Sequence, residues 1–148
     1  TPASAPLKTP APSTGDDYTT PSSQVQEEIL LNLLNQERIA QGLSPLTLDA
    51  ELSRIARIKS ADMRDNHYFA HESPTYGHVS DMLKTFGYSF SGAGENIAHH
   101  ATTEKAHAAF MSSDGHRRNI LSSAWQKVGL GIVYDANGYV YVTQIFVR

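Results

Sequence analysis

Three residues whose side chains could do chemistry, His71, Glu95 and His116, each lie in a short and distinctive stretch of sequence. The stretches are Tyr-Phe-Ala-His-Glu-Ser-Pro at 68–74, Gly-Ala-Gly-Glu-Asn-Ile-Ala at 92–98 and Ser-Asp-Gly-His-Arg-Arg-Asn-Ile-Leu at 113–121. Imidazole and carboxylate groups are ligands of divalent cations and also the groups of general acid–base chemistry. Because the three residues are 24 and 21 positions apart, only a tertiary fold could bring them together.

His71 is expected in a turn, because Pro74 disfavours helical geometry at Ser73. The alternative to a functional role is a histidine that bonds the backbone and locks this turn. His67 lies four residues earlier, a spacing that places two histidines on one helix face in zinc peptidases. The residue after His67 is Tyr68 rather than the Glu that those enzymes need, so that class is excluded. We interpret His67 as a residue at the end of a helix.

Glu95 has Gly92 and Gly94 before it, and glycine permits both unusual backbone conformations and close approach of neighbouring atoms. One interpretation is a carboxylate that accepts backbone N–H bonds in a tight turn. The other is a carboxylate that points into a cleft. In either case we expect Asn96 to brace the loop through its side chain.

His116 is followed by Ile120 and Leu121, which we expect to be buried and to hold the segment in place. Ser113 lies three residues before His116, so a serine-based mechanism has a nucleophile and a base. The sequence around it contains neither a Gly-x-Ser-x-Gly elbow nor another nucleophile turn, and we do not favour this mechanism.

The composition excludes several classes of protein. A chain of 148 residues with a net charge of −3 and a pI near 6.1 is not typical of a nucleic-acid binder. No apolar run approaches the roughly 20 residues of a membrane helix, and the polar start carries no hydrophobic leader, so we expect a cytosolic protein or a trimmed mature form. With no cysteine, the chain has no disulfides, thiolate zinc sites or cysteine nucleophile. We expect one domain and a monomer.

Residues 1–23 differ in composition from the rest of the chain. Most of them are Pro, Ala, Ser or Thr, and such a segment buries too little apolar surface to offset the entropy of ordering. We therefore predict a disordered linker over residues 1–23, of the kind that joins an extracellular domain to an anchor, followed by one domain over residues 24–148. A remnant of trimming is the alternative.

Hydrophobic periodicity and capping signals predict helices first and strands last in this domain. The predicted helices run from Ser22 or Ser23 to before Gly42, over 50–66 behind an Asp49 cap, over 78–86, and over 103–111. The second helix should bury Leu52, Ile55, Ala56, Met63 and the stem of Lys59. Strands are predicted over 128–134 and 139–147 around an Asn-Gly hairpin turn, with a third short strand at 97–98. This order is typical of an α+β fold with helices covering the sheet.

Taken together, the three motifs resemble the CAP superfamily, the cysteine-rich secretory, antigen 5 and pathogenesis-related class one proteins that share the SCP domain. The resemblance runs from about Val25 to Arg148 and is nearest to the cysteine-free bacterial branch. It implies an α-β-α sandwich with about four helices around a small antiparallel sheet.

The resemblance also implies a site. The family positions that match His71, Glu95 and His116 converge in a central cleft, where two histidines hold zinc or another divalent cation. Glu95 would complete a three-ligand set only if it reaches the ion directly. A second glutamate of the family cleft falls at Ser113 here, and His78 is close enough to the His71 turn to line the same cleft. We expect no metal to be required for folding, and we expect His99, His100 and His107 at the surface.

Three functions are compatible with this sequence. The first is a secreted or cell-surface binding domain that takes a divalent cation and an extracellular ligand, such as a lipid, a glycan, a peptide or a cell-envelope component. The second is a zinc-assisted hydrolase in which Glu95 activates water. The third is a structural envelope or spore-surface protein with a vestigial cleft.

Overall fold

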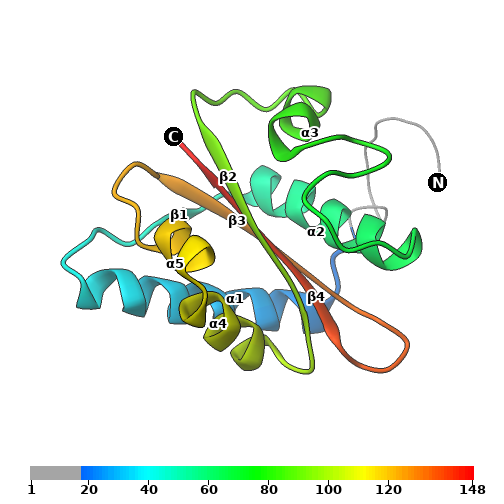
Figure 1. Ribbon diagram of the computed structural model, residues 1–148, viewed down its shortest axis with the longest axis horizontal. Helices are drawn as coiled ribbons and strands as arrows, with labels where there is room; N and C mark the ends of the chain where they lie inside the picture. Colours follow the sequence, from blue (N-terminus) through cyan, green and yellow to red (C-terminus); the bar gives the residue numbers. More distant parts are fainter. Residues whose placement is uncertain (1–17) are drawn as a thin grey trace.

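The computed structural model describes residues 18–148, and within them the chain forms five helices and one four-stranded sheet (Figure 1). The helices are α1 Pro21–Ala40, α2 Ala50–Asp65, α3 Val79–Thr85, α4 Thr103–Ser112 and α5 Asp114–Ile120. The strands are β1 Thr47–Leu48, β2 Ala93–His100, β3 Lys127–Tyr134 and β4 Val140–Val147. The predicted α+β class is confirmed. The greater part of the predicted linker, residues 1–17, lies outside the described residues.

Helix α1 begins earlier than its sequence suggested. Thr20, not Ser22 or Ser23, is the N-cap: its hydroxyl accepts from the Ser23 N–H at 3.0 Å, and the Ser23 hydroxyl accepts from the Thr20 N–H at 2.9 Å. Pro21 occupies the first helical position, where its fixed φ is suited to a helix and its missing N–H costs nothing. Residues 21–23, the last of the predicted linker, are therefore part of helix α1.

The sheet has the order β1-β3-β4-β2, with β1 parallel to β3 and the other pairs antiparallel. The parallel β1 was not expected. Strand β2 is eight residues long rather than two, so Glu95 lies in a strand and not in a turn. Neither Gly92 nor Gly94 has a positive φ. Gly94 instead allows close approach, because a Cβ there would lie 2.9 Å from the Trp125 ring.

Helices pack on both faces of the sheet, which gives the predicted α-β-α arrangement (Figure 1). One apolar cluster joins α1, α4 and α5 to one face, and a second joins α2 and α3 to the other. Helix α2 packs so closely on β3 that a Cβ on Gly129 or Gly131 would lie 2.4 or 2.1 Å from α2 backbone atoms. Since successive residues of a strand point to opposite faces, β2 directs Glu95 and Ile97 toward the α2 layer and Asn96 and Ala98 toward the α4–α5 layer.

Helix α5 was missed by the sequence prediction. Ser113 ends α4 and caps α5 at the same position, so the two short helices are separated by a single non-helical residue. Gly115 within the first turn weakens the propensity signal, and a helix of seven residues shows little periodicity. The His116 motif is therefore helical, and Ile120 anchors it in the core with no exposed surface, as predicted.

Candidate functional site

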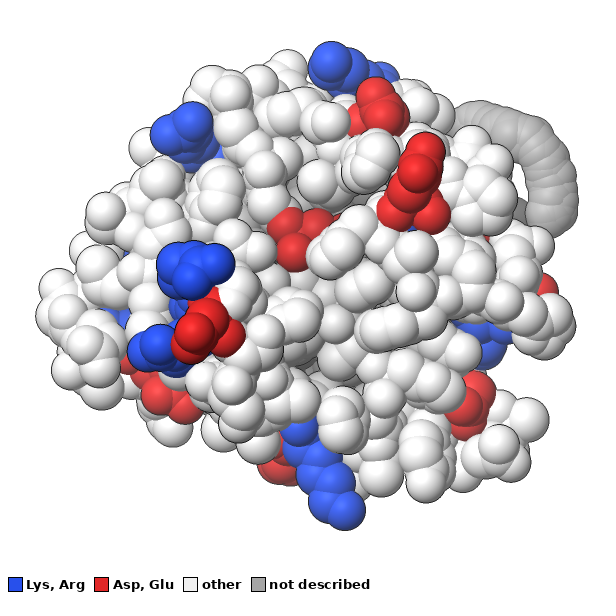
Figure 2. All heavy atoms as spheres, viewed as in Figure 1, with Lys and Arg blue, Asp and Glu red and all other residues white. Residues whose placement is uncertain are grey.

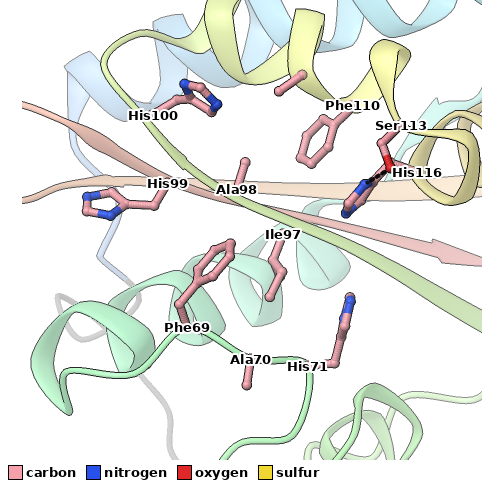
Figure 3. A pocket seen from close by; sticks show the side chains of 11 residues that line it. Phe69, Ala70, His71, Ile97, Ala98, His99, His100, Phe110, Ser113 and His116 are labelled. Carbon is pink, nitrogen blue, oxygen red and sulfur yellow. Dashed lines mark hydrogen bonds between the residues drawn. The ribbon is translucent and has the colours of Figure 1, made fainter.

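A pocket of about 410 Å³ lies over the edge strand β2, between the loop that follows α2 and the helices α4 and α5 (Figure 3). Its lining consists of Phe69, Ala70, His71, Ile97, Ala98, His99, His100, Ala109, Phe110, Ser113 and His116. Figure 3 shows the His71 and His116 rings pointing toward one another from opposite walls. Folding thus brings these two predicted residues to one pocket.

The loop that carries His71 is fixed at the end of α2. His67 adopts φ +56°, and the Tyr68 N–H then bonds the Met63 carbonyl at 3.1 Å, which closes the helix and turns the chain. Beyond the turn, the Asp62 carboxylate accepts hydrogen bonds from the hydroxyls of Tyr68 and Ser73. Burial, assisted by the bond to Asp62, raises the pKa of Tyr68, so this hydroxyl stays a donor.

Lys59 of α2 also holds this loop in place. Its ammonium donates to the His71 carbonyl oxygen at 2.9 Å, and its side chain is 1 % exposed, so the expectation that only its stem is buried was wrong. Burial lowers the pKa of Lys59 below its ordinary value, and the nearby carboxylates of Glu95 and Asp62 offset part of that shift. The backbone of His71 is therefore tied to the core although its ring is half-exposed.

Glu95 orients the His71 ring. The distance from His71 Nδ1 to Glu95 Oε1 is 2.9 Å, and the Glu95 side chain is 3 % exposed. An ionised carboxylate accepts a hydrogen bond from the Nδ1–H of His71, so Nε2 keeps its lone pair on the pocket side. Glu95 Oε2 is buried and has no hydrogen-bond partner among residues 18–148. Glu95 is not among the residues that line the pocket, so it contacts His71 from the side away from the cleft.

His116 is held from the opposite wall. Its Nδ1 lies 2.9 Å from the Ser113 hydroxyl, and its ring packs on Phe110 with centroids 5.3 Å apart. Burial of the ring, and secondarily the imidazole of His71, lower the pKa of His116 below its ordinary value. The neutral form of His116, which is the form that binds metal ions, is thereby favoured.

An amide network beneath the pocket connects the two predicted motifs. The Asn96 side chain donates to the His116 carbonyl at 3.1 Å and to Gln144 Oε1 at 3.0 Å. Asn119 donates to Asn96 Oδ1 at 2.9 Å and to the Glu95 carbonyl at 3.3 Å. Asn96 has no exposed surface, as expected for a bracing residue, although it braces a strand against α5 rather than a loop.

The other predicted residues have mixed outcomes. Ser113 lines the pocket, whereas His78 is exposed at the N-terminus of α3, where its N–H donates to Asp81, and is outside the lining. His99 and His100 lie at the surface as expected but also line the far end of the pocket. His107 is not a surface residue, because it is 6 % exposed and its Nε2 lies 2.9 Å from Glu37 of α1.

Two imidazoles therefore face one another, each with its Nδ1 engaged. Within residues 18–148, no group of three or more His, Cys, Asp and Glu side chains is arranged to hold a metal ion. Glu95 was predicted as the third ligand, but one of its carboxylate oxygens bonds His71 and the other is buried. The two imidazoles supply fewer protein ligands than the three that catalytic zinc sites usually have.

The fold and this arrangement define the class of protein. Residues 31–146 match the CAP family, described as the cysteine-rich secretory protein family, and the chain belongs to it.

Its similarities to particular proteins are as follows. It is 45 % identical over 141 residues to the protein YkwD of Bacillus subtilis (strain 168), a match over 93 % of this chain and 54 % of YkwD. The membrane protein YlbC of the same organism is 35 % identical over 123 residues, a match over 82 % of this chain and 34 % of YlbC. An extracellular SCP-domain protein from Bacillus anthracis superposes with a TM-score of 0.78 at 33 % identity, over 94 % of this chain and 45 % of that one. The chain thus spans about half or less of each relative.

Among the helices of residues 18–148, none has the length and apolar character needed to cross a membrane.

Proposed function

We propose that this chain is an extracellular CAP binding domain whose pocket takes a divalent cation, zinc for example, together with an extracellular ligand. The observation that carries the proposal is the pair of imidazoles that face one another across the pocket, each with its Nδ1 held by a fixed oxygen. Such hydrogen bonds fix the ring and the tautomer of a metal-ligating histidine. The Bacillus anthracis relative is an extracellular protein, which supports this location.

With two protein ligands, the cation would be held loosely and exchangeably. His71 and His116 would bind it through Nε2, and Glu95 would act by holding His71. Bound zinc supplies Lewis-acid polarisation of a ligand oxygen. The apolar clusters on both faces of the sheet are extensive, so we expect folding to need no metal.

The position of Glu95 favours binding over hydrolysis. A general base must come within about 3 Å of the water that it activates, directly or through one further water. Glu95 bonds His71 on the side away from the pocket and does not line the pocket. The lining contains no Asp or Glu at all. A hydrolase mechanism would therefore need Glu95 to leave His71.

The test is a zinc titration of metal-free protein followed by thermal denaturation. A ligand that binds only the folded state must raise its stability, and zinc at 100 times its dissociation constant adds about 2.7 kcal/mol. The double variant His71→Ala, His116→Ala should lose this response. The double variant His67→Ala, His78→Ala, which removes two exposed histidines outside the pocket, should keep it. An equal zinc response in both double variants would refute the site.

A further inference from the structure

The pocket lies on the free edge of β2, which no other strand of residues 18–148 covers. In the order β1-β3-β4-β2, strand β2 pairs only with β4. Gly92 and Arg148, just beyond the paired strands, exchange both backbone hydrogen bonds, at 3.4 and 3.0 Å. Because hydrogen-bonded pairs alternate in an antiparallel ladder, the even-numbered residues of β2 bond β4 and the odd-numbered residues turn their N–H and C=O groups away from it. The Glu95 carbonyl follows this pattern, since it accepts from Asn119 on the side away from β4.

The opposite long edge shows how this fold satisfies such groups. On β3, the outward N–H of Leu130 bonds the Ser53 hydroxyl at 3.2 Å, and the outward N–H of Ile132 bonds the Glu27 carboxylate at 3.2 Å. On β2, the outward backbone groups of Ile97 and His99 have no hydrogen-bond partner within residues 18–148. Each of these two residues offers one N–H donor and one C=O acceptor, and the residues are about 6.6 Å apart along the strand. These four groups therefore lie on the floor of the pocket.

The walls of the pocket lie on both sides of this open edge. Phe69 and Ile97 are on the side of the α2 loop, and Ala98 and Phe110 are on the side of α4 (Figure 3). The lining contains no Lys, Arg, Asp or Glu. Figure 2 shows this face hollowed in its middle, with a red acidic side chain beside the hollow and both acidic and basic side chains around the periphery. Without a bound cation, an anionic head group would meet no Lys or Arg in this lining, whereas a neutral chain with apolar branches on both sides would fit both walls.

We propose that this pocket binds an extended, uncharged peptide segment as a fifth strand on β2. The peptide backbone would bond Ile97 and His99, and its successive side chains would point alternately toward Phe69 and toward Phe110, as in recognition by strand addition. At the other end of the pocket the same peptide would pass His71 and His116. A cation bound by these two histidines could be coordinated by a carbonyl oxygen of the peptide. The proposal rests on the proposed function for the use of this pocket, but strand pairing itself does not need the cation.

Hydrogen exchange tests the pairing directly. The probe is the uncharged pentapeptide acetyl-Thr-Val-Leu-Val-Thr-amide, for which we expect a dissociation constant on the order of 1 mM or tighter. At ten times that constant, exchange of the Ile97 and His99 amides should slow by about tenfold, whereas the amides of Asn96 and Ala98, already bonded to β4, should change little. Binding without protection of Ile97 and His99, or no binding up to about 10 mM, overturns the proposal.

Backbone methylation gives an independent readout. In an added strand, only alternate peptide N–H groups face β2, so N-methylation of one alternating set should abolish protection and N-methylation of the other should leave it. Equal effects of both sets would show side-chain binding only and would contradict strand addition. Protection of the same amides by a neutral glycan fragment and not by the peptide would also overturn the proposal.

A pair of protein variants isolates the His99 N–H. His99→Pro removes that outward N–H without removing a bond to β4, at an edge position where proline is tolerated. His99→Ala is the matched control, because it loses the stacking on Tyr141 and the Asp135 pair but keeps the N–H. Peptide affinity should fall about tenfold between alanine and proline, and equal affinities contradict the proposal. Zinc titration separates the two proposals, since peptide protection without a zinc response rejects only the cation.

Discussion

His71 and His116 reach one pocket from opposite layers of the fold. His71 follows α2 and is held by Glu95 and by Lys59 of α2, whereas His116 lies on α5 and is held by Ser113. The edge strand β2 passes between them and supplies Glu95 on one face and the adjacent Asn96 on the other. One short strand segment thus positions both walls of the pocket.

Removal of the Glu95 charge should weaken the cation site without emptying it. Glu95→Gln keeps the shape of the side chain but loses the charge-assisted bond to His71 Nδ1. Outer partners of metal-bound histidines affect metal affinity by about 10- to 100-fold, so the zinc midpoint should rise by that factor. Calorimetry in metal-buffered solution measures it, with Glu72→Gln, an exposed neighbour, as the control. An unchanged midpoint would mean that Glu95 does not support His71 as a ligand.

The stability of the metal-free protein should depend on the titration of His116. Its pKa is lowered in the folded state, so between the unfolded value near 6.5 and the lower folded value the unfolded chain binds more protons. The free energy of unfolding should therefore be highest above about pH 6.5 and decrease as the pH falls through this window. Urea denaturation at several pH values, with a chelator present, should show a weaker decrease for His116→Gln. An unchanged pH profile in the variant contradicts this assignment.

The contact between α2 and β3 should not tolerate a methyl group. A Cβ on Gly131 would lie 2.1 Å from backbone atoms of Ala56 and Arg57, so Gly131→Ala must displace the helix. Overpacking of this kind costs about 1–3 kcal/mol. Gly115→Ala on α5 is the matched control, since its nearest neighbour is an Arg118 nitrogen 4.0 Å away. Equal free energies of unfolding for the two variants would be inconsistent with this packing.

Lys59 should act on the His71 loop rather than on the sheet. Lys59→Met retains most of the buried volume but leaves the His71 carbonyl without its donor, which costs about 1–3 kcal/mol for a buried group. The amides of residues 69–73 should then exchange faster, while those of β4 follow global stability alone. Lys84→Met on α3 is the control. Faster exchange confined to β4 would contradict the assigned role.

Much of the fold follows from local sequence signals. Asp49 as an N-cap and the Asn137-Gly138 hairpin were both predicted, because each is decided by a few adjacent residues. The start of α1 was misplaced because four hydroxyl residues near it, Thr19, Thr20, Ser22 and Ser23, could each act as a cap. The parallel pairing of β1 with β3 depends on residues 80 positions apart and has no local signal.

The site was only partly predictable for the same reason. Family motifs identified His71, Glu95 and His116, but not that Glu95 bonds His71 instead of facing the cleft. The role of Lys59 was hidden by its helical periodicity, which matches that of an ordinary core position. His99 and His100 lie outside the motifs, and their place in the lining depends on β2 being an edge strand. A longer strand prediction through Glu95 would have revealed the alternation that separates Glu95 from Asn96.

The central claim, that folding sets two imidazoles around one cation position, is tested most directly by anomalous diffraction at the zinc edge from crystals soaked in zinc. The claim predicts one strong peak in the pocket, about 2.0–2.1 Å from Nε2 of both His71 and His116. A map with no peak between these rings, or with zinc bound only by other histidines, would contradict it.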